Sequence, residues 1–120
     1  MYINVLPLQN KSFGENLSEV SLGHFSLSEY STKNLRVGIA ASGVAGTCTV
    51  KLQGRIPGGD YEDLGAVSVI LGNGSNHILV NIEDFDTHGA YMPLPKTCRL
   101  VLTTGAGAAV TVEQTSIQVG

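Results

Sequence analysis

The sequence predicts an all-β protein that folds as a two-sheet β-sandwich, with a jelly roll as the favoured type. Apolar residues alternate with polar ones in most segments, glycine-rich turns separate these segments regularly, and no segment has helical spacing. Charged residues make up only 14% of the 120 residues and glycine occurs 15 times, which is typical of strands and tight turns. We expect one domain over residues 1–120, because a chain of this length can bury one adequate core.

Residues 1–33 depart from strict alternation. Apolar residues in 1–33 are spaced loosely, from Tyr2 and Val5 to Phe25. We therefore expect an extended N-terminal arm over residues 1–10, followed by one or two strands. A short strand over Tyr2–Leu6 could equally pair with a neighbouring subunit.

From residue 35 onward, apolar side chains recur at every second position in seven segments, and about eight strands are expected in all. Because each strand has one apolar face, two sheets must cover each other. The side chains predicted to point inward are Leu35, Val37, Ile39, Val50, Leu52, Val67, Val69, Val80, Ile82, Leu100, Leu102, Val110 and Val112.

Turn residues separate these strands. Glycine, asparagine or proline occurs in 42–46, 57–59, 72–74 and 105–107, and these residue types suit the backbone angles of tight hairpins. The longest stretch without alternation is EDFDTHGAYMPLPKT, residues 83–97. Long loops often carry contacts with partners, so this stretch is a candidate for such contacts.

The two cysteines, Cys48 and Cys98, fall on the apolar side of alternating segments. Their wide separation does not match a zinc knuckle or a redox pair. We expect two small buried core residues. A disulfide stays open if the two strands are neighbours, although a reducing cytosol would oppose it.

The charge distribution disfavours nucleic acid as a partner. The net charge is −3, and residues 56–120 hold two basic and seven acidic groups. No basic stripe is available to release counterions. The first residues, MYINVLPLQN, lack the features of a signal peptide, and no apolar run is long enough to span a bilayer, so a soluble protein without a membrane partner is expected.

No group of residues predicts catalysis, a cofactor or a metal. Carboxylates gather at Asp60, Glu62 and Asp63 and again at Glu83, Asp84 and Asp86, but neither group has the ligand pattern of a calcium loop. The histidines, His24, His77 and His88, have no metal-ligand spacing. No serine lies in a nucleophile elbow and no glycine motif opens a helix.

The stretch KLQGRIPGGDYEDLG, residues 51–65, is interpreted as structural. Pro57–Gly59 should form the turn and Tyr61 should pack at the margin of the sheet. The carboxylates of Asp60, Glu62 and Asp63 should be largely solvated.

Three segments together resemble small structural proteins of tailed-bacteriophage virions. They are TVKLQGRIPGGDYEDLG with its Leu-Gln-Gly and aromatic-x-x-Leu-Gly motifs, the turn GNG, and CRLVLTTGAGAAVTV with its Arg-Leu-x-x-Thr-x-Gly motif. The resemblance covers residues 47–113 and is strongest to capsid decoration, or cement, proteins. It implies a non-enzymatic oligomer, often a trimer, that binds the major capsid protein lattice on the outside of the virion after synthesis in the host cytoplasm.

Contacts with such a lattice are expected from the N-terminal arm and from the long loop. The residues predicted to take part are Tyr2, Ile3, Val5, Leu6, Leu8, Phe85, His88, Tyr91 and Met92. Two other classes stay open. One is a tail or receptor-binding accessory domain of a phage. The other is a carbohydrate-binding module, which the absence of tryptophan disfavours.

Overall fold

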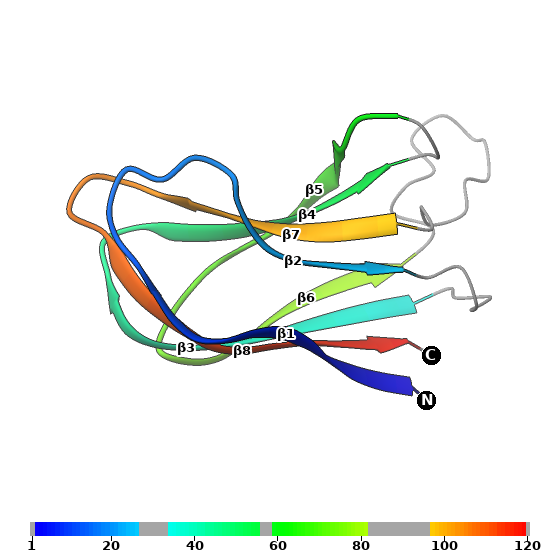
Figure 1. Cartoon of the computed structure of the whole chain (residues 1–120), viewed down its shortest axis with the longest axis horizontal. Helices are drawn as coiled ribbons and strands as arrows, with labels where there is room; N and C mark the ends of the chain where they lie inside the picture. The colour runs from blue at the N-terminus through cyan, green and yellow to red at the C-terminus, as the bar shows by residue number, and fades with distance from the viewer. Residues whose placement is uncertain (1, 27–33, 56–58, 82–96, 120) are drawn as a thin grey trace.

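The computed structural model describes residues 2–26, 34–55, 59–81 and 97–119, and shows two antiparallel sheets packed face to face (Figure 1). Sheet I has the strand order β1 (Tyr2–Phe13), β8 (Ala109–Val119), β3 (Asn34–Ala45) and β6 (Gly74–Asn81). Sheet II has the order β2 (Val20–Ser26), β7 (Thr97–Thr104), β4 (Cys48–Arg55) and β5 (Glu62–Ile70). This order is that of an eight-stranded jelly roll, so the predicted fold class is confirmed.

The core fills the space between the two sheets. Of the predicted inward set, nine side chains are buried and Val69 is partly buried against them. The side chains of Val67, Val80 and Ile82 lie outside the described part of the structure. The nine buried residues are Leu35, Val37, Ile39, Val50, Leu52, Leu100, Leu102, Val110 and Val112.

The N-terminal segment is a strand of sheet I and not an arm. Tyr2 pairs with Val119 and Phe13 with Val110, so β1 follows β8 along its length. The register shifts between Val5 and Gln9, around Pro7. A proline is tolerated in a strand at the edge of a sheet, and β1 is an edge strand. In place of the expected arm over residues 1–10, residues 2–10 thus belong to an edge strand, because the backbone groups on one side of this segment pair with β8. The alternative of a strand over Tyr2–Leu6 has the right element, and its partner here is β8 of the same chain.

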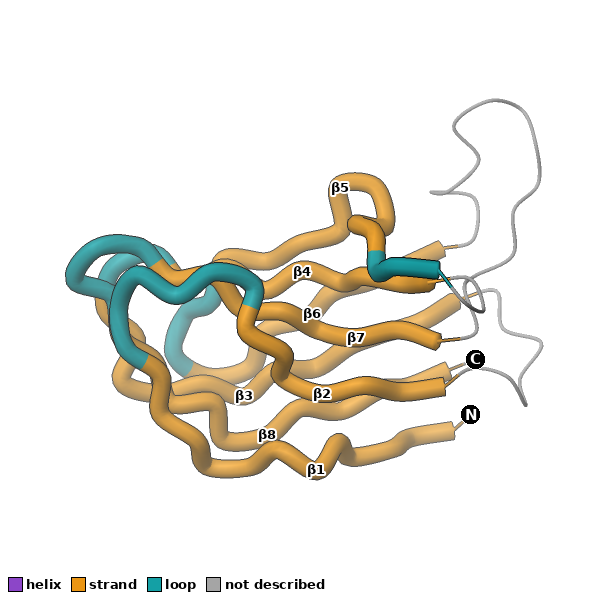
Figure 2. The backbone as a smooth tube through the Cα atoms, turned by 45° about the horizontal axis from the view of Figure 1, so that its top comes forward, coloured by secondary structure: helices purple, strands orange, loops and turns teal. Residues whose placement is uncertain are grey.

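Most of the described connections gather at one end of the sandwich (Figure 2). There, the connection after β1 is bonded to the end of β7. Asn16 N donates to Gly105 O at 3.1 Å, Thr104 N donates to Leu17 O at 3.0 Å, and Leu17 N donates to the Thr104 hydroxyl at 2.9 Å. These bonds tie the first strand of sheet I to sheet II.

Gly46, in the turn from β3 to β4, is required by both conformation and space. Its φ is +65°, and a Cβ at this position would lie 2.9 Å from the Cα of Ala108. Gly43 has a similar φ of +60°, but nothing lies within 4 Å of a Cβ built there. Only Gly46 therefore allows the β3–β4 turn to approach the β7–β8 turn closely.

Both cysteines are buried core residues, as predicted, and they do not form a disulfide. They lie in neighbouring strands, but at opposite ends: Cys48 pairs with Thr104, and Cys98 pairs with Gly54. Burial raises the pKa of the Cys98 thiol to about 12. The open question of a disulfide is thus answered by the register between β4 and β7.

Candidate functional site

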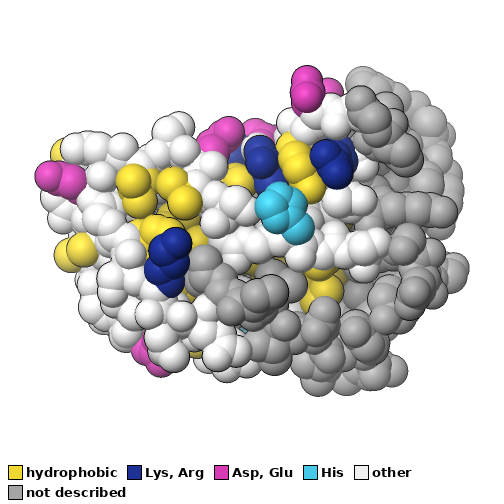
Figure 3. Space-filling model, in the orientation of Figure 1, with side chains coloured by type: hydrophobic (Ala, Val, Ile, Leu, Met, Phe, Trp, Pro, Cys, Tyr) yellow, Lys and Arg dark blue, Asp and Glu magenta, His cyan; other side chains and the backbone are white. Residues whose placement is uncertain are grey.

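A cluster of polar and aromatic side chains lies on the outer face of sheet II. We call it the Tyr61 cluster, and it consists of His24, Gln53, Arg55, Tyr61 and Arg99. Figure 3 shows this face, where basic side chains, a histidine and hydrophobic atoms are in contact with one another. The described residues offer no other place where two arginines meet an aromatic ring.

Strand pairing brings these residues together from distant parts of the sequence. Gln53 of β4 pairs with Arg99 of β7, and His24 of β2 pairs with Arg99 from the other side. Arg55 follows Gln53 by two positions and therefore points to the same face. Tyr61 stands just before β5, next to the pair Gly54–Glu62.

Tyr61 is the centre of the cluster. The guanidinium carbon of Arg99 lies 4.2 Å from the ring centroid of Tyr61, and that of Arg55 lies 4.9 Å from it. The His24 ring is tilted by 53° with its centroid 5.7 Å away. These are cation–π distances, so the ring attracts both cations. Tyr61 thus packs at the margin of the sheet, as predicted.

Gln53 orients the arginine beneath the ring. Arg99 Nε donates a 2.8 Å hydrogen bond to Gln53 Oε1, and Gln53 Nε2 donates a 2.8 Å hydrogen bond to Asp63 Oδ1. Although Gln53 faces outward from the sandwich, it is only 3% exposed. A buried amide with both ends bonded has one stable orientation, so Arg99 is held by a fixed acceptor.

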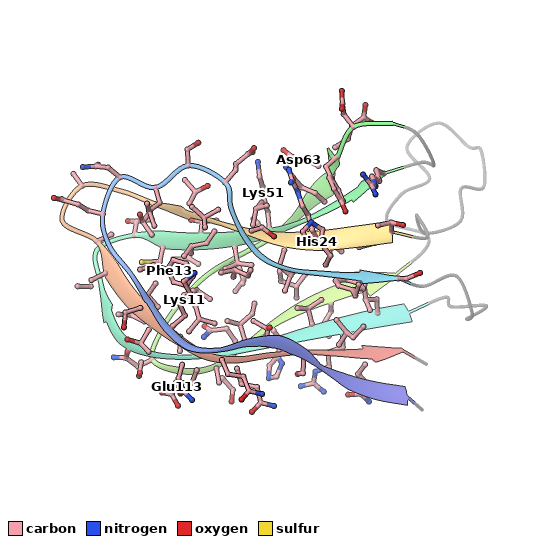
Figure 4. The ribbon with its side chains drawn as sticks, viewed as in Figure 1. Lys11, Phe13, His24, Lys51, Asp63 and Glu113 are labelled. Carbon is pink, nitrogen blue, oxygen red and sulfur yellow. The ribbon has the colours of Figure 1, made fainter. Side chains whose placement is uncertain are left out.

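Next to the cluster, Lys51 joins two carboxylates. Its Nζ lies 2.7 Å from Glu19 Oε1 and 3.0 Å from Asp63 Oδ2. Figure 4 labels Lys51, Asp63 and His24 on this side of the molecule. The hydrogen bond from Gln53, and then that from Lys51, lower the pKa of Asp63. The hydrogen bond to Glu19, and then that to Asp63, raise the pKa of Lys51.

The charge of Lys51 is neutralised by two carboxylates, whereas Arg55 and Arg99 have no carboxylate partner among the described residues. Within the described residues, the two ion pairs between a cation and a carboxylate both involve Lys51. Arg55 is exposed and Arg99 is half-buried, and their described contacts are with Tyr61 and Gln53. The cluster therefore has a local excess of positive charge in a chain whose net charge is −3.

The structure separates the three carboxylates of the 51–65 stretch. All three are exposed, as predicted, but Asp63 is also bonded to Lys51 and Gln53. Pro57 lies outside the described residues. Among the residues that are described, no three His, Cys, Asp or Glu side chains could hold a metal ion. His24 and His77 lie on strands of different sheets, while His88 and the group Glu83, Asp84 and Asp86 fall outside the described residues.

The predicted partner contacts fall where the structure describes little. Tyr2, Ile3, Val5, Leu6 and Leu8 belong to β1, but only their backbone is described. The residues predicted from the long loop, Phe85, His88, Tyr91 and Met92, lie outside the described residues. These contacts remain predictions.

The sequence did not predict the arginines or Gln53 as site residues. Their spacing along the chain carries no signal, because they meet only through the order of β2, β7, β4 and β5. Because Val50 and Leu52 are predicted to point inward, alternation places Lys51 and Gln53 on the outer face. Its burial comes from Asp63 and Arg99, which no local pattern indicates.

A second surface feature lies on sheet I. It is a shallow depression of about 120 Å³, lined by polar and small side chains that include His77, Gln114 and Ser116. Gly38 creates the space, since a Cβ there would lie 2.9 Å from Ser116 Oγ. No charged side chain lines it, so it offers fewer directed contacts than the Tyr61 cluster.

No protein-family model matches the chain, and no curated protein matches it in sequence. Solved structures do share its fold. The SPBc2 prophage-derived protein YomS aligns with a TM-score of 0.53 at 12% identity, covering 100% of this chain and 96% of that one. A Bacillus endospore appendage that forms disulfide-linked pili aligns with a TM-score of 0.52 at 9% identity, covering 97% and 84%.

A chain of the T13 IBDV viral particle also aligns, with a TM-score of 0.52 at 12% identity, covering 97% of this chain and 30% of that one. At such identities the likeness concerns the fold alone. The described residues contain no helix long and apolar enough to cross a membrane.

Proposed function

We propose that the protein is a non-enzymatic structural component of a phage virion that binds and stabilises the assembled capsid as a decoration protein. One observation carries this proposal. Three of the motifs behind the resemblance to virion proteins meet in the Tyr61 cluster: Arg99 of Arg-Leu-x-x-Thr-x-Gly contacts both Gln53 of Leu-Gln-Gly and Tyr61 of aromatic-x-x-Leu-Gly.

Contact among the motifs gives the resemblance a physical basis. Strand pairing places these motifs side by side, and Arg99 also joins them through side-chain contacts. Here the glutamine, the tyrosine and the arginine depend on one another, because Gln53 fixes Arg99 and Arg99 packs on the Tyr61 ring. The motif residues therefore form one three-dimensional arrangement on sheet II of this protein, which supports the proposed role.

The fold is compatible with this role. Jelly rolls are common in viral capsid domains, and the structures that share this fold include a prophage-derived protein and a viral particle chain. A fold hosts many functions, so this likeness supports the proposal without carrying it. We also propose self-association, with a trimer as the favoured state that the resemblance implies, on the virion exterior.

Many identical copies of a capsid protein make modest affinity sufficient, because an oligomer binds several lattice sites at once. The proposed contacts come from the N-terminal part of β1 and from the segment containing Phe85, His88, Tyr91 and Met92. The edge of β1 opposite β8 is available for main-chain pairing, which is one way in which an extended segment can join two proteins.

The test is to mix the purified protein with undecorated phage heads and image them. We expect density on the outer shell. A truncation of residues 1–9 would remove most of β1, so point variants are preferable: Ile3→Ser for the first segment and Tyr91→Ala for the second. If the wild type leaves the shell bare and antibodies find the protein on tails, the tail alternative replaces the capsid proposal. Light scattering that reports only monomer would overturn the trimer.

A further inference from the structure

The Tyr61 cluster has the properties of a binding site for a carboxylate. We propose that Arg55 and Arg99 together bind an acidic side chain in a segment of a protein partner. This inference rests on the proposed function, because it names the chemistry that the partner presents. It concerns a surface that the sequence did not predict.

Arg99 is oriented before any partner binds. Its Nε donates to Gln53 Oε1 at 2.8 Å, and Gln53 is buried and fixed in turn by Asp63. This bond uses only one of the five N–H groups of the guanidinium. The terminal nitrogens have no hydrogen-bond partner among the described residues. A planar pair of N–H donors matches the two oxygens of a carboxylate.

A second cation reinforces the first. The Arg55 guanidinium carbon lies 4.9 Å from the Tyr61 centroid, and that of Arg99 lies 4.2 Å from the same centroid. One ring therefore keeps two like charges close to each other, and an anion bound beside them would relieve their repulsion. His24, whose ring also contacts Tyr61, adds a polar group at the rim.

Carboxylates of the chain itself do not occupy this position within the described residues. Glu19 and Asp63 are paired with Lys51. Asp60 and Glu62 flank Tyr61 in the sequence, but their side chains are exposed and neither forms a described ion pair with Arg55 or Arg99. Within the described structure, the position beside the two arginines is therefore open to a carboxylate of a partner.

The occupied ring favours a protein partner over a sugar. A carbohydrate site normally needs an open aromatic face for stacking. The Tyr61 ring is already in contact with two guanidinium groups and an imidazole. Phe13 and Phe25 are buried, so they cannot replace it as a platform. Directed hydrogen bonds to a carboxylate remain as the chemistry that this surface offers.

The experiment measures binding of a fluorescent oligoglutamate peptide by anisotropy at low salt. We compare the wild type with Arg55→Gln and with the control Arg36→Gln. Arg36 is an exposed arginine on β3 of the opposite sheet, so the control removes the same charge elsewhere. We expect Arg55→Gln to weaken binding about threefold to tenfold, as the loss of one charge-assisted contact implies, and Arg36→Gln to change it by less than about twofold.

Equal affinity of the wild type and Arg55→Gln would overturn the inference, as would equal weakening by Arg36→Gln, which would indicate a non-specific charge effect. An oligoglutamine peptide should not bind. Tighter binding of an oligogalacturonate than of oligoglutamate would also overturn it, because a sugar acid would then be the better ligand. Thermal melting of each variant verifies that it is folded.

Decoration of heads separates this inference from the proposed function. If the wild type and Arg55→Gln bind undecorated heads equally well, the capsid shell is the partner but the Tyr61 cluster does not contact it. This result would overturn the carboxylate inference and leave the proposed function intact. If the wild type binds the peptide and not the heads, the proposed capsid function fails while the carboxylate site stands.

Discussion

The Thr104 hydroxyl donates a 2.7 Å hydrogen bond to the carbonyl oxygen of Gly14, and it accepts a 2.9 Å hydrogen bond from the backbone N–H of Leu17. One buried side chain thereby holds both ends of the bend between β1 and β2 against the end of β7. Thr104→Val should destabilise the protein by about 1–3 kcal/mol, because it leaves the two backbone groups without their partner. Urea denaturation measures this change.

Thr115 provides the opposite case. It is completely buried, and its hydroxyl has no hydrogen-bond partner within the described structure. Thr115→Val keeps the shape of the side chain and removes the unpaired polar atom, so we expect no loss of stability and a gain of up to about 1 kcal/mol. The two threonine variants make the same chemical change. Similar losses in both would contradict the roles assigned to these hydroxyls.

Gly46→Ala should be more harmful than Gly43→Ala. Both residues have positive φ, so each alanine costs about 1 kcal/mol or somewhat more from the left-handed conformation. At Gly46 the new methyl group also meets the backbone of Ala108, which cannot move without displacing the neighbouring turn. We expect an additional loss of at least about 1 kcal/mol, measured by denaturation. Equal losses would show that this close approach is not important.

Asp63→Asn should lower the free energy of unfolding at pH 7 by less than about 1 kcal/mol, because its partner Lys51 lies at the surface and Asp63 is half exposed. The pKa of Asp63 is lowered in the folded state, so its contribution is complete above the ordinary aspartate pKa near 4 and is lost as pH falls through the folded-state pKa. The wild type and Asp63→Asn should therefore converge in acid.

Asp60→Asn is the matched control for this pH series, since Asp60 is an exposed acid of the same stretch without a described ion pair. Melting temperatures between pH 7 and pH 3 should separate Asp63→Asn from the wild type, while Asp60→Asn follows the wild type throughout. A gap that widens as the pH falls would contradict the lowered pKa.

Both thiols should resist alkylation in the folded protein. Cys48 and Cys98 are buried, and burial raises the pKa of each, to about 12 for Cys98. Little thiolate is then present at pH 8, and the reagent cannot reach it. Mass spectrometry after iodoacetamide treatment should find unmodified chains in buffer and doubly modified chains in urea. Rapid labelling of Cys98 without denaturant would show that β7 opens locally.

Much of the fold could be predicted from alternation alone, because each strand from β3 onward has one apolar face. Leu100 and Leu102 point inward as expected. Val101, between them, is also fully buried, although it does not belong to the main core. It pairs with Lys51, next to the ion pairs that lie on the outer face of sheet II. A period of two cannot indicate that a sheet is covered on its polar side.

The length and the pairing of the N-terminal strand could not be predicted for a related reason. Pro7 and the register shift between Val5 and Gln9 interrupt the alternation of β1, so its sequence resembles an arm. This segment nevertheless forms a strand, because it pairs with β8 through backbone hydrogen bonds that do not depend on side-chain type. The Tyr61 cluster could not be predicted either, because Gln53, Tyr61 and Arg99 become neighbours only through the strand order of sheet II.

The pairing of β1 with β8 has a consequence for how the chain folds. β8 lies between β1 and β3, so sheet I cannot be completed until β8 has left the ribosome. Until then β1 has no partner strand, and β3 can pair only with β6. Because contacts so distant in sequence form slowly, we expect a late folding step during synthesis, in which insertion of the last strand into the middle of a half-built sheet converts a protease-sensitive nascent chain into a resistant one.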